Sequence, residues 1–98
     1  MKKEVVVREL ALKNLEGACA WYEVQQTGLG SAFISEWESA VDFISRHPDF
    51  VRKRYKEFRV VGIRRFPYVI VFVNEKELIV IYNVIYSGRK ASKRYKTQ

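Results

Sequence analysis

The chain of 98 residues has very little of the residue types on which several kinds of site depend. It contains one cysteine, Cys19, and one histidine, His47. A lone cysteine excludes an intramolecular disulfide and a cysteine-rich metal site. A lone histidine excludes, within one subunit, Ser-His-Asp catalysis, Cys-His catalysis and histidine-rich zinc sites. Cys19 lies among apolar residues, so we expect a buried thiol, and we expect no metal and no cofactor.

Long apolar runs and phosphate-binding glycine loops are also missing. The longest apolar run, Tyr68–Val73, is much too short to span a bilayer, and the opening Met1–Val7 lacks the apolar stretch of a signal peptide. We therefore expect no membrane association and a cytoplasmic location. Gly28 and Gly30 lie between two predicted helices and do not follow a strand, so they lack the context of a nucleotide-binding loop.

Positive charge is concentrated in the second half of the chain. Residues 1–51 hold five Lys and Arg against eight Asp and Glu, whereas residues 52–98 hold thirteen against three, so the overall charge of +7 is polarised. A small domain of this kind normally meets an anion, most often a nucleic acid or the acidic surface of a protein. The acidic residues of the first half form no pair at the spacing of a metal or glycosidase site, and we expect them to keep a helical surface soluble.

Apolar periodicity predicts a short strand and then two helices in the first half. Val5–Val7 predicts the strand, and spacings of three and four predict a helix over residues 9–26. Its buried face is expected to hold Leu12, Leu15, Cys19 and Tyr22, with Trp21 beside them. Thr27–Gly30 ends this helix, Ser31 is the candidate N-cap of the next one, and Pro48 stops it. Tyr22, Phe33 and Trp37, like Trp21, are expected to pack in the core.

From Phe58 the period changes to two, which predicts strands. In the first of them, Arg64 and Arg65 are expected to point to opposite faces. Tyr68–Val73 is apolar on both faces, which is typical of a central strand, and residues 74–77 predict the turn to a returning strand at 78–85. The expected fold class is α+β: a two-helix antiparallel hairpin packed on a small, mainly antiparallel sheet, in the order β-α-α-β-β-β. We expect a single domain over residues 1–98 with a basic tail over 88–98.

Five short pieces of the sequence carry a family resemblance. They are Trp21-Tyr22-Glu23, Gly28-Leu29-Gly30 followed by Phe33, Pro48, Arg64-Arg65-Phe66-Pro67-Tyr68, and Arg89. In their order and separations they resemble the RelE/ParE superfamily of bacterial toxins from type II toxin–antitoxin systems. The resemblance covers nearly the whole chain and implies the fold given above. It also implies a cognate antitoxin whose flexible segment wraps around the toxin.

The resemblance leaves the activity open. RelE-like members cut messenger RNA on the ribosome without a metal, whereas ParE-like members are described as inhibitors of DNA gyrase without known catalysis. The Lys-x-Lys pair and the first Arg of RelE-like members fall here at Val60, Gly62 and Val69, so these groups are missing. Arg89 and Tyr95 match the remaining two. We therefore favour a ParE-like toxin that acts by binding, with an mRNA endonuclease and an inactive member that only binds its antitoxin as alternatives.

The candidate residues for binding the target or the antitoxin are basic side chains of the second half. They are Lys53, Arg54, Lys56, Arg59, Arg64, Arg65, Arg89 and Lys90. A guanidinium makes two-pronged contacts with phosphate or carboxylate, which favours Arg89 most. In a nuclease, Arg89 and Tyr95 are the candidate catalytic residues, because clustered positive charge favours a phenolate.

The expected partners follow from the resemblance and from the charge of the chain. They are a cognate antitoxin and, as target, DNA gyrase or the ribosome with its mRNA. We also expect a toxin–antitoxin hetero-oligomer, or a homodimer through the apolar face of the sheet that the helices leave uncovered.

Overall fold

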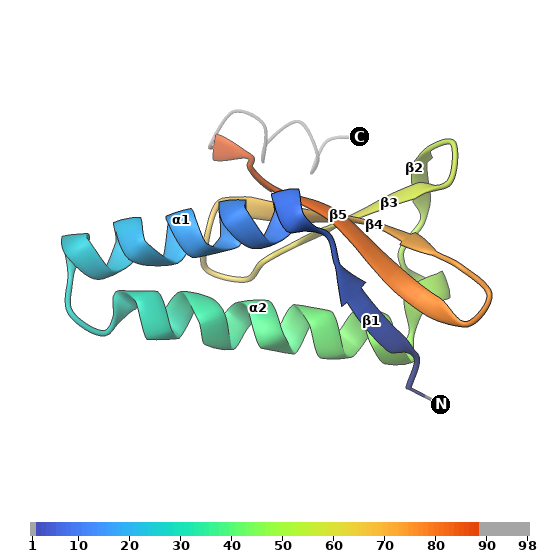
Figure 1. Cartoon of the computed structure of the whole chain (residues 1–98), viewed down its shortest axis with the longest axis horizontal. Coiled ribbons are helices and arrows are strands. Elements are labelled where there is room, and N and C mark those ends of the chain that lie inside the picture. The colour runs from blue at the N-terminus through green and yellow to red at the C-terminus, as the bar shows by residue number, and fades with distance from the viewer. Residues whose placement is uncertain (1, 89–98) are drawn as a thin grey trace.

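A computed structural model describes residues 2–88 of the chain, so Arg89, Lys90 and Tyr95 lie outside the described residues. The elements follow one another as β1 (Glu4–Val7), α1 (Glu9–Gln25), α2 (Leu29–Arg46), the short 3₁₀ helix η1 (Pro48–Phe50), β2 (Lys53–Tyr55), β3 (Phe58–Gly62), β4 (Tyr68–Asn74) and β5 (Leu78–Tyr86). The two helices lie side by side as one layer, with the sheet forming the other (Figure 1).

The sheet has five strands in the order β1-β5-β4-β3-β2. β1 runs parallel to β5, and the other neighbours are antiparallel. The predicted α+β class, the helical hairpin, the central position of β4 and the turn after Asn74 are confirmed. The short strand β2 was not predicted, because its three residues are all exposed and show no apolar alternation.

The core lies between the helical hairpin and β4 and β5. Its fully buried side chains include Phe33 and Ile44 from α2, Phe72 from β4 and Ile81 from β5. At one end the rings of Tyr22, Phe33, Phe66 and Tyr68 pack together, with centroid distances of 4.8 Å between Tyr22 and Phe66 and 5.1 Å between Phe33 and Phe66. The prediction that Phe33 packs in the core is therefore confirmed.

On the side of the sheet away from the helices, Val69 and Val80 are only 7% and 8% exposed. The expectation that this face lacks cover is therefore wrong at these two positions, and self-association through it stays a prediction.

The buried face of α1 differs from the predicted one. Ala11, Leu15 and Ala18 face the core, whereas Leu12 and Trp21 are 44% and 58% exposed, so the prediction that Trp21 packs is wrong. The sequence pattern pointed to the large apolar residues, but the small side chains of Ala11 and Ala18 let the helix approach the sheet closely.

The thiol of Cys19 also differs from the prediction, because it is half-buried instead of buried. Its Sγ atom lies 3.6 Å from the carbonyl oxygen of Gly30 in α2. Cys19 therefore belongs to the contact between the two helices.

The reversal between the helices depends on Gly28, Gly30 and Glu23. Gly28 has φ +92° and precedes α2 directly, so Ser31 lies inside the helix and is not its N-cap. A Cβ atom at Gly30 would lie 2.8 Å from the carbonyl oxygen of Cys19, so only glycine fits there. The carboxylate of Glu23 accepts hydrogen bonds from the backbone N–H groups of Gly28 and Gly30, both at 2.9 Å. A side chain of α1 thus caps the N-terminus of α2 and places a negative charge at the positive end of its dipole.

No helix within residues 2–88 has the length and apolar character needed to cross a membrane.

Replacement of Glu23 by alanine should lower the free energy of unfolding by about 1–2 kcal/mol, because two N–H groups at the start of α2 lose their acceptor. Urea denaturation followed by circular dichroism measures the change. Glu16→Ala removes an exposed carboxylate from the same helix and is the matched control. Equal effects of the two substitutions would show that the cap does not stabilise the hairpin.

Candidate functional site

The basic run at residues 52–56 lies on the edge of the sheet. β2 pairs with β3 through Lys53 opposite Arg59 and Tyr55 opposite Phe58, which leaves a two-residue turn at Lys56 and Glu57. Lys56 adopts φ +51°, a conformation that a tight hairpin turn requires of its central residues. Within residues 2–88, β2 is the last strand of the sheet, and β3 is its only neighbouring strand.

Arg59 fixes the segment that leads into β2. Its side chain is 11% exposed and donates to the carbonyl oxygens of Val51 at 2.6 Å and Pro48 at 3.4 Å. It also forms an ion pair with Asp49 at 3.4 Å. The guanidinium thereby ties η1 to β3. Most of the Arg59 side chain is covered, so it has little surface with which to bind a partner. Among the predicted binding residues, its role is to position the backbone segment that leads into β2.

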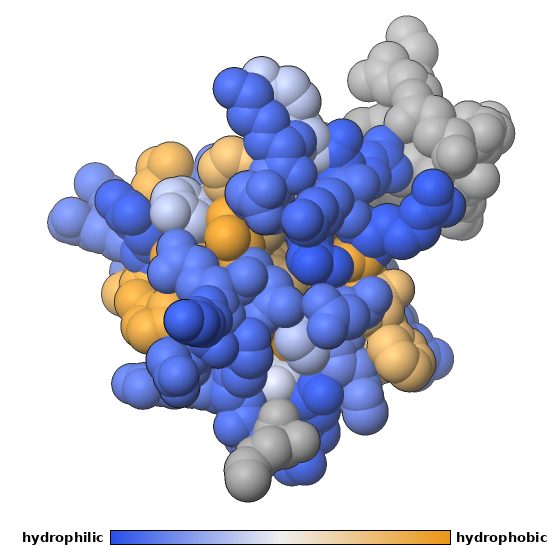
Figure 2. All heavy atoms as spheres, turned by 90° about the vertical axis from the view of Figure 1, so that its right-hand side faces the viewer, coloured by the Kyte–Doolittle hydropathy of each residue, from blue (hydrophilic) through white to orange (hydrophobic). Residues whose placement is uncertain are grey.

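A cationic pocket lies beside this anchored segment. It has a volume of about 530 Å³ and is lined by Phe50, Arg52, Lys53, Arg54 and Val60. The three basic residues have a single acidic neighbour in the same hairpin, Glu57, which forms an exposed ion pair with Lys53 at 3.2 Å. Exposed pairs of this kind are weak, so the pocket keeps a net positive charge. The side of the molecule that carries this hairpin is mainly hydrophilic, with its apolar residues in separate patches (Figure 2).

The pocket also has aromatic neighbours. Phe50 is 75% exposed and Tyr55 is 65% exposed. The ammonium group of Lys56 lies 5.3 Å from the ring centroid of Tyr55. Guanidinium and ammonium groups beside exposed rings can bind phosphate or carboxylate groups and also pack against a flat or apolar surface of the same partner.

Three of the basic residues expected to bind the target or the antitoxin lie at or beside this pocket. Lys53 and Arg54 were expected and line it, and Lys56 lies in the adjoining turn. Arg52 and Phe50 were missed. Arg52 could have been found, because it belongs to the same basic run. Phe50 could not, because an exposed and a buried phenylalanine look alike in a sequence.

Arg64 and Arg65 do not line the cationic pocket. β3 ends at Gly62, so the prediction that these arginines alternate on one strand is wrong; they occupy the turn between β3 and β4. Arg65 has φ +72°, and its side chain lies 3.8 Å from the carboxylate of Glu36 in α2. The turn follows the end of β3 opposite to the β2 hairpin. Within residues 2–88, the predicted cations therefore form two groups, one at each end of β3.

The raised pKa values of two tyrosines in the aromatic cluster make them unsuited to act as bases at neutral pH. The pKa of Tyr22 is raised above its usual 10.0, first by burial and then by the neighbouring Tyr68 and Tyr86. Burial, followed by Tyr86, likewise raises the pKa of Tyr68. Both phenols therefore stay protonated near neutral pH and cannot act as bases. Residues 2–88 contain no group of three or more His, Cys, Asp or Glu side chains that could hold a metal ion.

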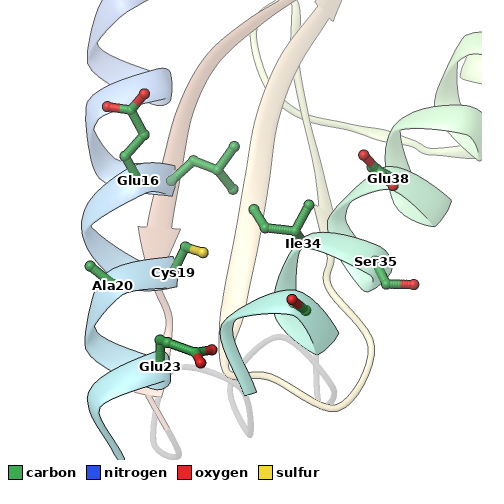
Figure 3. A pocket seen from close by; sticks show the side chains of 9 residues that line it. Glu16, Cys19, Ala20, Glu23, Ile34, Ser35 and Glu38 are labelled. Carbon is green, nitrogen blue, oxygen red and sulfur yellow. The ribbon is translucent and has the colours of Figure 1, made fainter. Parts of the chain in front are cut away.

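A second concavity lies between the two helices (Figure 3). It has a volume of about 640 Å³, and its apolar lining includes Leu15 and Ile34. The carboxylates of Glu16, Glu23 and Glu38 surround it. Its charge is thus opposite to that of the cationic pocket, and the Glu23 carboxylate is already occupied as the cap of α2.

The geometry defines a small α+β protein with a two-helix layer and a cationic pocket at one edge of its sheet. The sequence matches no family model and no curated protein. Among solved structures 11 chains match. One comes from the structure titled "Chromosomal ParDE TA system from P. aeruginosa", with a TM-score of 0.74, 13% identity, and coverage of 87% of this chain and 96% of that one. At this identity the likeness establishes a shared fold, and the fold that the RelE/ParE resemblance implied is confirmed.

Replacement of Arg59 by alanine should lower the free energy of unfolding by about 2 kcal/mol, because the carbonyl groups of Val51 and Pro48 lose a charged donor. Arg59→Lys should recover only part of this loss, since an ammonium cannot reproduce the planar fork. Arg64→Ala, in the exposed turn after β3, is the control. A full recovery with lysine would show that charge alone, and not the shape of the guanidinium, holds η1.

The raised pKa values of Tyr22 and Tyr68 make stability depend on alkaline pH. A folded-state pKa above the unfolded value contributes stability that is fully present below pH 10.0 and is lost as pH rises through the folded pKa. The free energy of unfolding should therefore fall above about pH 10. The fall should be smaller in Tyr22→Phe and Tyr68→Phe, whereas Tyr55→Phe removes an exposed phenol from outside the cluster and is the control. Urea denaturation at each pH measures the free energy of unfolding, and tyrosinate absorbance near 295 nm records the ionisation. If the fall is unchanged in both variants, Tyr22 and Tyr68 are not its source.

Proposed function

We propose that the chain is the toxin of a type II toxin–antitoxin pair, that it inhibits growth by binding a macromolecular target, and that a cognate antitoxin neutralises it. The observation that carries this proposal is the fold, which matches a chain from a ParDE TA system over 87% of the present sequence. The family resemblance of the sequence points the same way. DNA gyrase is the target that a ParE-like toxin would take.

The cationic pocket supports action by binding. Arg52, Lys53 and Arg54 line one concavity, and the covered guanidinium of Arg59 holds the segment in front of them. Guanidinium groups are permanently charged, so they bind anions well but do not act as general acids or bases at neutral pH. The positions of the missing RelE-like cations are apolar or glycine, and one of them, Val69, is buried. These features favour an anion-binding surface over a nuclease centre.

The polarised charge supports an antitoxin with an acidic binding segment. Such a segment would be attracted to the pocket and would exclude an anionic target from it. The complex should then weaken as salt is raised, because added ions screen exposed charges. A pull-down of the toxin expressed from its native operon tests the partner directly, and recovery of no small neighbouring protein would count against the pairing.

Induced expression in a bacterial host should slow growth and produce a DNA supercoiling defect. Primer extension on cellular transcripts is run in parallel. Cuts in phase with codons would replace the binding proposal with a ribosome-dependent mRNA endonuclease, and unimpaired growth would leave a protein that only binds its antitoxin.

The double substitution Arg52→Gln/Lys53→Gln should weaken target binding about tenfold for each charge-assisted contact that is lost, and should relieve growth inhibition accordingly. Lys13→Gln/Lys76→Gln removes the same amount of charge from residues that do not line the pocket and is the matched control. Equal relief by both doubles would show that only total charge matters and would reject the pocket as the binding site.

A further inference from the structure

One side of α1 exposes three large apolar side chains. The residues Leu10, Asn14, Gly17, Trp21 and Val24 follow one another at spacings of four and three and form a single stripe, the α1 stripe. Leu10, Trp21 and Val24 are 55%, 58% and 82% exposed. A tryptophan and two aliphatic residues aligned in this way are more than the scattered apolar residues of an ordinary surface.

The α1 stripe faces away from α2. Cys19 and Glu23 make the contacts of α1 with the start of α2. Gly17 and Cys19 are two residues apart, which is roughly 200° around a helix, so the stripe lies on the opposite side. The stripe is distinct from the concavity in Figure 3, which α1 lines with Leu15, Glu16, Cys19, Ala20 and Glu23. Asn14, at the inner margin of the stripe, donates to the side chain of Asn83 in β5 at 2.7 Å.

Gly17, at the centre of the stripe, makes no close contact with residues 2–88 that would require a glycine. It lies in the middle of α1 and is exposed, and a Cβ atom there would meet nothing within 4 Å. Glycine in a helix interior is less stable than alanine, so its presence normally reflects a close approach by another backbone. Gly30 illustrates such an approach inside this molecule, where an added Cβ would meet Cys19 at 2.8 Å. At Gly17 no backbone among residues 2–88 makes such an approach, which leaves room for the backbone of a partner.

The two ends of the stripe lie at equal distances from Gly17. Leu10 lies seven residues before it and Val24 seven residues after it, which is about 10.5 Å of helix in each direction. When a second α1 runs antiparallel with its Gly17 against this one, Leu10 of each copy faces Val24 of the other. This is the self-complementary arrangement that a two-fold axis requires.

The charge of the stripe also fits a second copy. None of its five residues is charged, although the chain carries a net charge of +7. An acidic partner would gain most from the cationic hairpin, whereas two copies of the same cationic protein associate best through an uncharged surface. We propose that the α1 stripe is the interface of a homodimer in which two α1 helices pack antiparallel and cross at Gly17.

The interface is small. One face of a four-turn helix on each side places it near the lower limit for specific association, about 1,200 Å² in total. We therefore expect a dissociation constant on the order of 10 µM, with Trp21 making the largest contribution, because tryptophan dominates binding at such interfaces. The dimer leaves the cationic pocket open, and it does not depend on the chain being a toxin.

Cysteine cross-linking tests the geometry. In a Cys19→Ser background, Gly17→Cys should form a disulfide-linked dimer under mild oxidation, whereas Leu10→Cys alone should stay largely monomeric. A mixture of Leu10→Cys and Val24→Cys proteins should yield the mixed dimer. Efficient self-linking of Leu10→Cys would overturn the proposal in favour of a parallel pair, and failure of the Leu10→Cys and Val24→Cys mixture to form the mixed dimer at 100 µM protein, about ten times the expected dissociation constant, would overturn the interface.

Sedimentation equilibrium of the unmodified chain and its variants gives an independent measurement. Trp21→Glu should weaken dimerisation by more than a hundredfold, while Phe50→Glu, the same kind of change at an exposed aromatic outside the stripe, should leave it unchanged. Gly17→Ala should raise the melting temperature of the dilute monomer and yet weaken the dimer about tenfold, since the added methyl group separates the helices. A chain that is monomeric at all concentrations, or a dimer that Trp21→Glu does not affect, would refute the proposal.

Discussion

The contact of Phe33 with Phe66 and Tyr68 holds the helical layer on the sheet. Phe33 is fully buried, and its ring meets Phe66 edge-on at 5.1 Å and Tyr68 at 5.3 Å. Phe66 belongs to the turn between β3 and β4, and Tyr68 begins β4, so one side chain of α2 fixes the turn and the start of the central strand together. The position of the exposed arginines in that turn follows from this contact. At the far end of β3, Arg59 has the same role for η1 and β2, with hydrogen bonds in place of ring packing.

The fold was largely predictable because its long elements follow simple periods. The dense apolar run of β4 favours a central strand, and the paired glycines between the helices favour a turn. The short strand β2 and the buried face of α1 were not predictable in the same way. β2 exists because Arg59 and the turn at Lys56 bring a polar segment against β3, which is a tertiary effect. The alanines of α1 are buried because the helix lies close to the sheet. An alanine contributes little to the apolar periodicity of a sequence, so their burial could not be read from it.

The candidate site was predictable as a charge distribution but not as a shape. The basic run at residues 52–56 predicted where positive charge would gather. It could not show that the Arg59 side chain is mostly covered and donates to backbone carbonyl groups. Nor could it show that Arg64 and Arg65 occupy a separate turn. Alternation assigns side chains to faces only while a strand continues, and β3 ends two residues before Arg64.

The parallel pairing of β1 with β5 joins the two ends of the chain. Glu4 lies opposite Leu78, and Lys3 donates to the side chain of Asn74, 71 residues away. The helical hairpin and the hairpins of β2 to β5 need only neighbours that are close in sequence, whereas β1 has no strand to pair with until almost the whole domain has been synthesised. Loop closure over so many residues is slow. During translation the first strand must therefore wait until β5 has been made, and the pairing of β1 with β5 is the last step that completes the sheet.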